Sequence, residues 1–91
     1  MQVNFRYSDT DFIAYMITLG YEYNNIEVTT DKRNKLKAFV YFLGDKNKLI
    51  NLQEQFKNGK AMVNALDYSL NRKKINKLIK SELLRYQAKR L

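Results

Sequence analysis

Residues 64–91 read NALDYSLNRKKINKLIKSELLRYQAKRL, and this stretch decides the fold. Apolar side chains recur in it at the three- and four-residue spacing of one helix face, which predicts a single long amphipathic helix. Asn64 is suited to cap the helix, and Asp67 falls in the first turn, where the helix dipole favours an acid. Uninterrupted, such a helix is about 40 Å long. The remainder of the chain must therefore provide a platform for it.

The two sides of this predicted helix differ in character. One side carries the apolar stripe Tyr68, Ile75, Leu78, Ile79, Leu83 and Tyr86. The opposite side carries Lys73, Lys77 and Lys80 together with Leu66, Leu70 and Leu84. Leu66 and Leu70 interrupt the polar side, so either the helix bends near Asn71 or its first two turns are buried on several sides.

Residues 1–63 predict a small α/β platform. Its expected elements are a strand over 2–7, a helix from an N-cap at Ser8 to Leu19, strands over 21–30 and 35–43, and a helix over 45–58 capped by Asp45. Gly20 and Gly59 follow the two helices as left-handed terminators. Asn34 is suited to a positive φ in the turn between the strands, and a bulge is expected at Asn24-Asn25. The predicted fold is a single α+β domain, residues 1–91, with a two- to three-stranded antiparallel sheet and the order β-α-β-β-α-α.

The strand over 35–43 is apolar on both faces. Leu36, Ala38, Val40 and Phe42 share one face, and Phe39, Tyr41 and Leu43 share the other. This pattern is typical of a central strand that is covered on both sides. The alternative is that Phe39 and Tyr41 stack on nucleic-acid bases, as exposed sheet aromatics do. Coverage is favoured, because no pattern of interleaved Gly and Lys surrounds them and the last helix needs an apolar surface.

Composition argues against most catalytic chemistry. The chain has no Cys and no His, which removes the usual zinc and copper ligands and the commonest general base. The Asp9-Thr10-Asp11 pair is better explained by helix capping than by a metal. We expect a protein that is not an enzyme and that holds no metal and no cofactor. Its sequence shows no signal peptide and no apolar run long enough for a membrane, so the expected location is the cytoplasm.

Charge is distributed unevenly along the chain. Residues 1–45 hold five Lys/Arg and six Asp/Glu, whereas residues 46–91 hold twelve and three. This asymmetry favours a polyanionic partner, with nucleic acid first. The candidate phosphate-binding residues are Lys57, Lys60, Arg72, Lys73, Lys74, Lys77, Lys80, Arg85, Lys89 and Arg90. An alternative is that ten Asn and twelve Lys reflect the codon usage of an AT-rich genome.

Several segments resemble a known group of proteins. They are Ser8-Asp9-Thr10-Asp11, Leu19-Gly20-Tyr21, Phe39-Val40-Tyr41-Phe42 and, above all, residues 52–68 with FKNGKAMV (56–63) at their centre and Val63-Asn64 before the last helix. The chain resembles, over about residues 7–79, a family of small phage and mobile-element proteins of low-GC Gram-positive bacteria. That family carries no established activity, so the resemblance implies a genomic context that includes DNA-binding accessory proteins and inhibitors of host defence. The basic extension from Lys80 onward goes beyond the family pattern.

The sequence therefore predicts a small phage-type accessory protein that binds DNA or RNA through its basic C-terminal helix, largely without base specificity. A second hypothesis is a phage-encoded inhibitor of a host protein or of a nucleic-acid-guided defence complex. A third is a homodimer that associates through the apolar stripe of residues 75–86.

Overall fold

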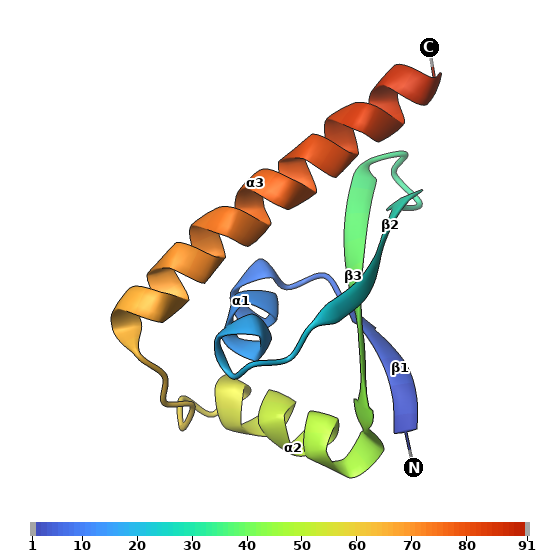
Figure 1. Ribbon diagram of the computed structural model, residues 1–91. Helices are drawn as coiled ribbons and strands as arrows, with labels where there is room; N and C mark the ends of the chain where they lie inside the picture. Colours follow the sequence, from blue (N-terminus) through green and yellow to red (C-terminus); the bar gives the residue numbers. More distant parts are fainter. Residues whose placement is uncertain (1, 91) are drawn as a thin grey trace.

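The computed structural model describes residues 2–90 as a three-stranded antiparallel sheet with three helices (Figure 1). The elements are β1 (Gln2–Tyr7), α1 (Thr10–Thr18), β2 (Tyr23–Thr30), β3 (Leu36–Asp45), α2 (Lys46–Lys57) and α3 (Ala65–Arg90). The predicted α+β class and the order β-α-β-β-α-α are confirmed. Most element bounds lie within two residues of those expected from the sequence.

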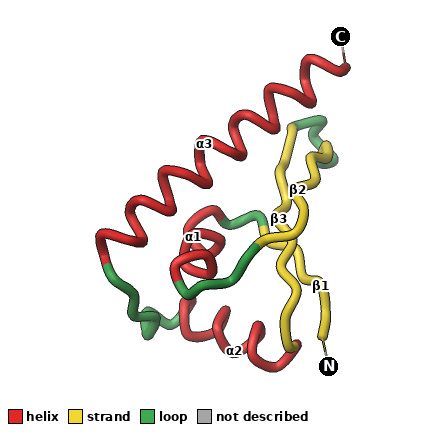
Figure 2. Tube along the Cα trace, viewed as in Figure 1, coloured by secondary structure: helices red, strands yellow, loops and turns green. Residues whose placement is uncertain are grey.

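The sheet has the order β1-β3-β2, with β3 in the centre (Figure 2). Both outer strands are antiparallel to β3, so β1, α1 and β2 form a split βαβ unit with β3 between its strands. The β2–β3 turn contains Asn34 at φ 63°, and the register of β2 shifts between Tyr23 and Asn25. The positive φ and the irregularity next to Asn24 are both confirmed.

Only one face of the sheet is covered by helices. All three helices lie on the same side of it in Figure 1. Val40 and Phe42 of β3 face the helices and are fully buried, whereas Leu43 on the other face is 57% exposed. The prediction that β3 is covered on both sides is therefore wrong. Three helices suffice to bury one face of so narrow a sheet, and residues 2–90 contain no further element for the other.

Capping side chains define where the helices begin. The Asp9 carboxylate accepts a hydrogen bond from the Asp11 backbone N–H, so α1 is capped by Asp9 and not, as expected, by Ser8. Asp45 caps α2 by accepting from the Lys48 N–H, and the hydrogen bond from the Asp67 N–H to the Asn64 side chain places Asn64 at the start of α3. A carboxylate one residue nearer the helix reaches the first-turn N–H that Ser8 was expected to satisfy.

The core is centred on α1, where residues 12–16 are all buried. Phe12 lies between Tyr7 of β1 and Phe56 of α2, with ring centroids 4.8 and 5.4 Å away in edge-to-face arrangements. Ile75 of α3, 2% exposed, belongs to the same cluster. The sheet, α2 and α3 thus converge on one short helix.

The long helix α3 is uninterrupted from Ala65 to Arg90. Ile75 is buried, and Leu78 and Ile79 pack against the core, as the apolar stripe predicts. Leu66 and Leu70, however, are 68% and 48% exposed, so the explanation that they are buried on several sides is wrong. Figure 1 shows α3 without a sharp bend, so the alternative explanation, a bend near Asn71, is also not met. In Figure 1 the second half of α3 runs beside the β2–β3 hairpin, which lengthens the platform.

Candidate nucleic-acid interface

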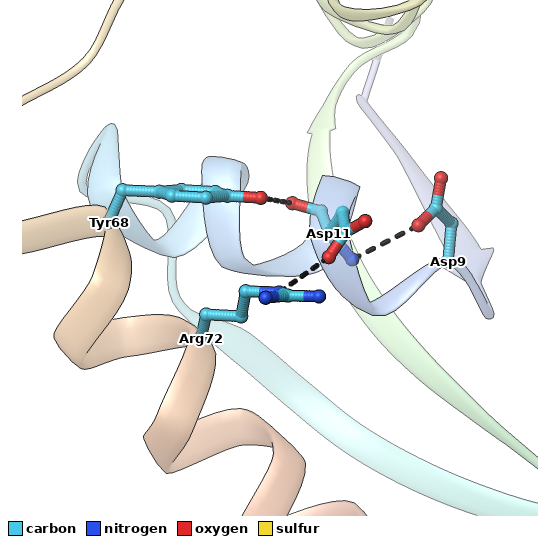
Figure 3. Close-up of polar contacts among 4 residues, drawn as sticks. All are labelled: Asp9, Asp11, Tyr68 and Arg72. Carbon is cyan, nitrogen blue, oxygen red and sulfur yellow. Dashed lines mark hydrogen bonds and ion pairs between the residues drawn. The ribbon is translucent and has the colours of Figure 1, made fainter. Parts of the chain in front are cut away.

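Polar contacts between α3 and α1 accompany the packing of the apolar side of α3 on the core. The Arg72 Nε donates to Asp11 Oδ1 at 2.7 Å, and the Tyr68 hydroxyl donates to the Asp11 backbone carbonyl at 3.3 Å. Figure 3 shows both α3 side chains reaching toward Asp11 at the start of α1. Asn71 adds a hydrogen bond to Thr18 at 3.1 Å. Exposed ion pairs stabilise by at most about 1 kcal/mol, less than the burial of one Ile, so the burial of Ile75 chiefly sets the orientation and these contacts add to it.

This orientation turns a group of lysines toward solvent. Lys73, Lys74, Lys77 and Lys80 are all exposed, and we call them the α3 lysine surface. They line one open hollow together with Leu70 and Asn76, and no carboxylate of the described residues lines it. The four ammonium groups lie on little more than two turns of one helix, so their potentials add at the surface.

The other candidate residues on α3 lie in different surroundings. Arg72 forms the ion pair with Asp11, and Arg85 lies 3.5 Å from the Glu82 carboxylate. Arg85 and Lys89 line a separate hollow with Ile26 and Val28 of β2. The side chain of Arg90 lies outside the described residues. The structure therefore groups four of the predicted residues and separates the rest.

Lys57 and Lys60 are also exposed but belong elsewhere. Lys57 lies at the end of α2 and lines a hollow with Arg6 and Phe39, away from the α3 lysine surface. Lys60 follows Gly59, whose φ of 70° ends α2 as the sequence predicts. These two lysines do not line the hollow formed by the α3 lysine surface.

Two tyrosines have perturbed ionisation. Burial raises the pKa of Tyr68, and the nearby Asp11 carboxylate raises it further. Burial also raises the pKa of Tyr7, with a smaller contribution from Tyr21. Both phenols therefore remain neutral hydrogen-bonding groups at neutral pH.

The described part of the chain has neither a metal-binding cluster nor a membrane-spanning helix. Residues 2–90 contain no group of three or more carboxylate, His or Cys side chains placed to hold a metal ion. Over the same residues, no helix combines the length and apolarity that crossing a bilayer requires.

Sequence reasoning missed one group of residues, on the uncovered face of the sheet. Arg6 and Lys37 lie beside the Phe39 ring, with Arg6 Cζ 4.2 Å from the ring centroid. Strand alternation could place each residue on a face, but the contact requires the pairing register of β1 with β3. That register depends on long-range packing, which has no local signal.

Comparison of the chain with protein-family models, with curated proteins and with solved structures finds no match. The resemblance to a family of phage and mobile-element proteins stays a prediction. Function is therefore inferred from the surface chemistry of the molecule itself.

Proposed function

We propose that this protein binds nucleic acid through the α3 lysine surface, without catalysing a reaction. The observation that carries the proposal is the grouping of four exposed lysines around one hollow that no carboxylate of residues 2–90 lines. The opposite side of α3 is buried against α1 and the sheet, so the helix is held in place while its lysines remain free to bind phosphates.

The chemistry of lysine favours phosphate contacts over base recognition. An ammonium group on a flexible stem acts as a point charge and lacks the planar fork with which Arg reads guanine. Binding is therefore largely independent of sequence and strongly dependent on salt, because each phosphate neutralised releases counterions. A small accessory protein that coats or bridges DNA or RNA fits this behaviour.

The test is fluorescence anisotropy of a labelled 20-base-pair duplex over a range of salt concentrations. Four phosphate contacts give a slope of about −3.5 for log K against log salt. The double variant Lys73→Gln/Lys77→Gln removes two contacts and reduces the steepness of the slope by about 1.8. Gln keeps the helix propensity of Lys, so α3 should remain folded.

Arg72→Gln is the matched control, since it removes one charge from the same helix. Its guanidinium is already paired with Asp11, so its loss should change the slope less than the loss of one lysine. The proposal fails if wild-type protein does not bind at low salt, or if the double variant retains the wild-type slope.

A second candidate function is favoured by the leucines beside the lysines. Met62, Leu66 and Leu70 are 89%, 68% and 48% exposed, and Leu70 lines the same hollow as the four lysines. Exposed apolar side chains with polar neighbours are a feature of protein-binding surfaces. This fits a phage-encoded inhibitor that binds a host protein or a nucleic-acid-guided defence complex. A stoichiometric host protein captured after nuclease treatment, and lost with Leu66→Ser/Leu70→Ser, would favour this function over direct nucleic-acid binding.

A further inference from the structure

The uncovered face of the sheet presents aromatic and cationic side chains together. Phe39 and Tyr41 lie on it in β3, Arg6 comes from β1, and Lys37 lies two residues before Phe39. We call these four residues the sheet platform. No helix covers this side of the sheet in Figure 1, and the helix-facing side chains of β3 already form the core. The platform aromatics are therefore not needed to fill the interior.

Two cations lie beside the Phe39 ring. Arg6 Cζ is 4.2 Å from the ring centroid and Lys37 Nζ is 5.5 Å from it. The Arg6 side chain remains 53% exposed, and its nearest carboxylate, that of Glu27, is 3.6 Å away. An aromatic ring and a guanidinium are the two kinds of planar group on which proteins stack unpaired bases.

A hollow adjoins the platform and brings a third cation to it. It has a volume of about 260 Å³, and its lining includes Arg6 and Phe39 of the sheet, Asp9 before α1, and Gln53 and Lys57 of α2. Lys57, exposed at the end of α2, thus lines the same hollow as Phe39, while Lys37 lies along β3. Positive charge is present both at the hollow and along β3, where the phosphates of a bound strand would lie.

We propose that the sheet platform binds single-stranded nucleic acid, with a base stacked on the Phe39 ring and the Arg6 guanidinium and with neighbouring phosphates on Lys37 and Lys57. The occupant is a single strand because a duplex keeps its base planes within its own stack. The charges support a polyanion, since three cations lie at the platform and both nearby carboxylates among the described residues are engaged. Glu27 contacts Arg6 and the Tyr41 hydroxyl, and Asp9, which lines the hollow, accepts the capping hydrogen bond from the Asp11 N–H. Ribose and deoxyribose strands share these bases and phosphates, so both bind.

This site is separate from the α3 lysine surface and does not depend on it. The α3 lysine surface attracts phosphates of any nucleic acid, whereas the sheet platform distinguishes unpaired from paired bases. Measurements in the Lys73→Gln/Lys77→Gln background therefore isolate the platform. Failure of one site leaves the other measurable.

Phe39→Trp provides a direct reporter, because the natural chain contains no Trp. Stacking of a base on the introduced indole should quench its fluorescence when ten-residue oligouridine or oligothymidine is added, and a 20-base-pair duplex should not quench it. Two results overturn the proposal: the duplex quenches the indole fluorescence as strongly as the single strands do, or neither the single strands nor the duplex quenches it.

Phe39→Leu tests the stacking energy while keeping an apolar side chain in β3. Single-strand affinity should fall roughly 5- to 150-fold, the range for one stacked base, and duplex affinity should not change. Leu43→Ala is the matched control, since Leu43 lies on the same face of the same strand and is 57% exposed. The proposal is overturned if Phe39→Leu and Leu43→Ala lose the same single-strand affinity, or if Phe39→Leu loses as much affinity for the duplex as for the single strand. Circular dichroism verifies that each variant is folded.

Discussion

At the residue scale, Asp11 connects the start of α1 to α3. Its backbone N–H donates to Asp9, its carbonyl accepts from Tyr68, and its carboxylate pairs with Arg72. The sequence explained both aspartates by helix capping, and this holds for Asp9. The Asp11 carboxylate instead engages a residue 61 positions away, which no local pattern indicates.

Tyr68→Phe should lower the free energy of unfolding by about 1 kcal/mol at pH 7, because the Asp11 carbonyl loses its donor while the ring still packs. The raised pKa of Tyr68 means that the folded state favours the neutral phenol. The contribution is therefore complete below pH 10, the ordinary value for Tyr, and declines as pH rises through the raised pKa. Urea unfolding at pH 7, 9 and 11 should show the wild-type advantage over Tyr68→Phe shrinking at pH 11.

Tyr23→Phe is the control for this measurement, since Tyr23 is 41% exposed and should change stability little at any pH. An advantage of wild type over Tyr68→Phe that stays constant from pH 7 to pH 11 would contradict the proposed role of the phenol.

At the element scale, α3 has one side that packs against the core and one side that faces solvent. Ile75, Leu78 and Ile79 attach it to the core, and the four lysines of the α3 lysine surface face outward. Leu66 and Leu70 share the outward side and remain exposed, because the first turns of α3 extend along α1 without meeting the sheet. A hydrophobic pattern specifies which residues prefer burial but does not supply a surface to bury them.

Ile75→Ala should lower the free energy of unfolding by about 2–5 kcal/mol. The Ile75 side chain of α3 is buried in the core, and its truncation leaves a cavity there. Leu66→Ala removes a similar side chain from the exposed side of the same helix and should change stability by no more than about 0.5 kcal/mol. Urea unfolding of the two variants checks both values. A large loss for Leu66→Ala would show that its side chain is buried in solution, for instance by a second copy.

At the scale of the whole molecule, α3 gives the protein an elongated shape. The Cα radius of gyration is 13.9 Å and the principal extents are 42 × 31 × 23 Å, whereas a compact chain of this length has a radius of about 12 Å. The apolar stripe expected to support a homodimer is used within the chain, since Ile75, Leu78 and Ile79 pack on its own core. Dimerisation through that stripe would require α3 to leave α1 and the sheet.

We therefore expect a monomer in solution. Small-angle X-ray scattering should give a forward intensity matching one chain and a radius of gyration of about 14 Å before the contribution of the hydration layer. A twofold intensity that persists on dilution would contradict this expectation and would identify the exposed leucines of α3, rather than the apolar stripe, as the dimer contact.

The sequence by itself determined the class of the fold, the element order and most boundaries, because these follow from local physics. Alternation marks a strand, helical spacing marks a helix, and Gly20, Asn34 and Gly59 mark the positions that need a positive φ. The sequence also located the basic segment, because the positions of Lys and Arg along the chain are read from it directly.

Only the tertiary structure decided which faces are covered. Placing three helices on one side of the sheet left Phe39 half-buried beside Arg6 on the other, and the packing of Ile75, Leu78 and Ile79 on the core left four lysines facing outward together. Both outcomes depend on contacts between residues far apart in the chain, and such contacts are set by global packing. A side chain carries its chemistry in the sequence, but its accessibility belongs to the folded molecule.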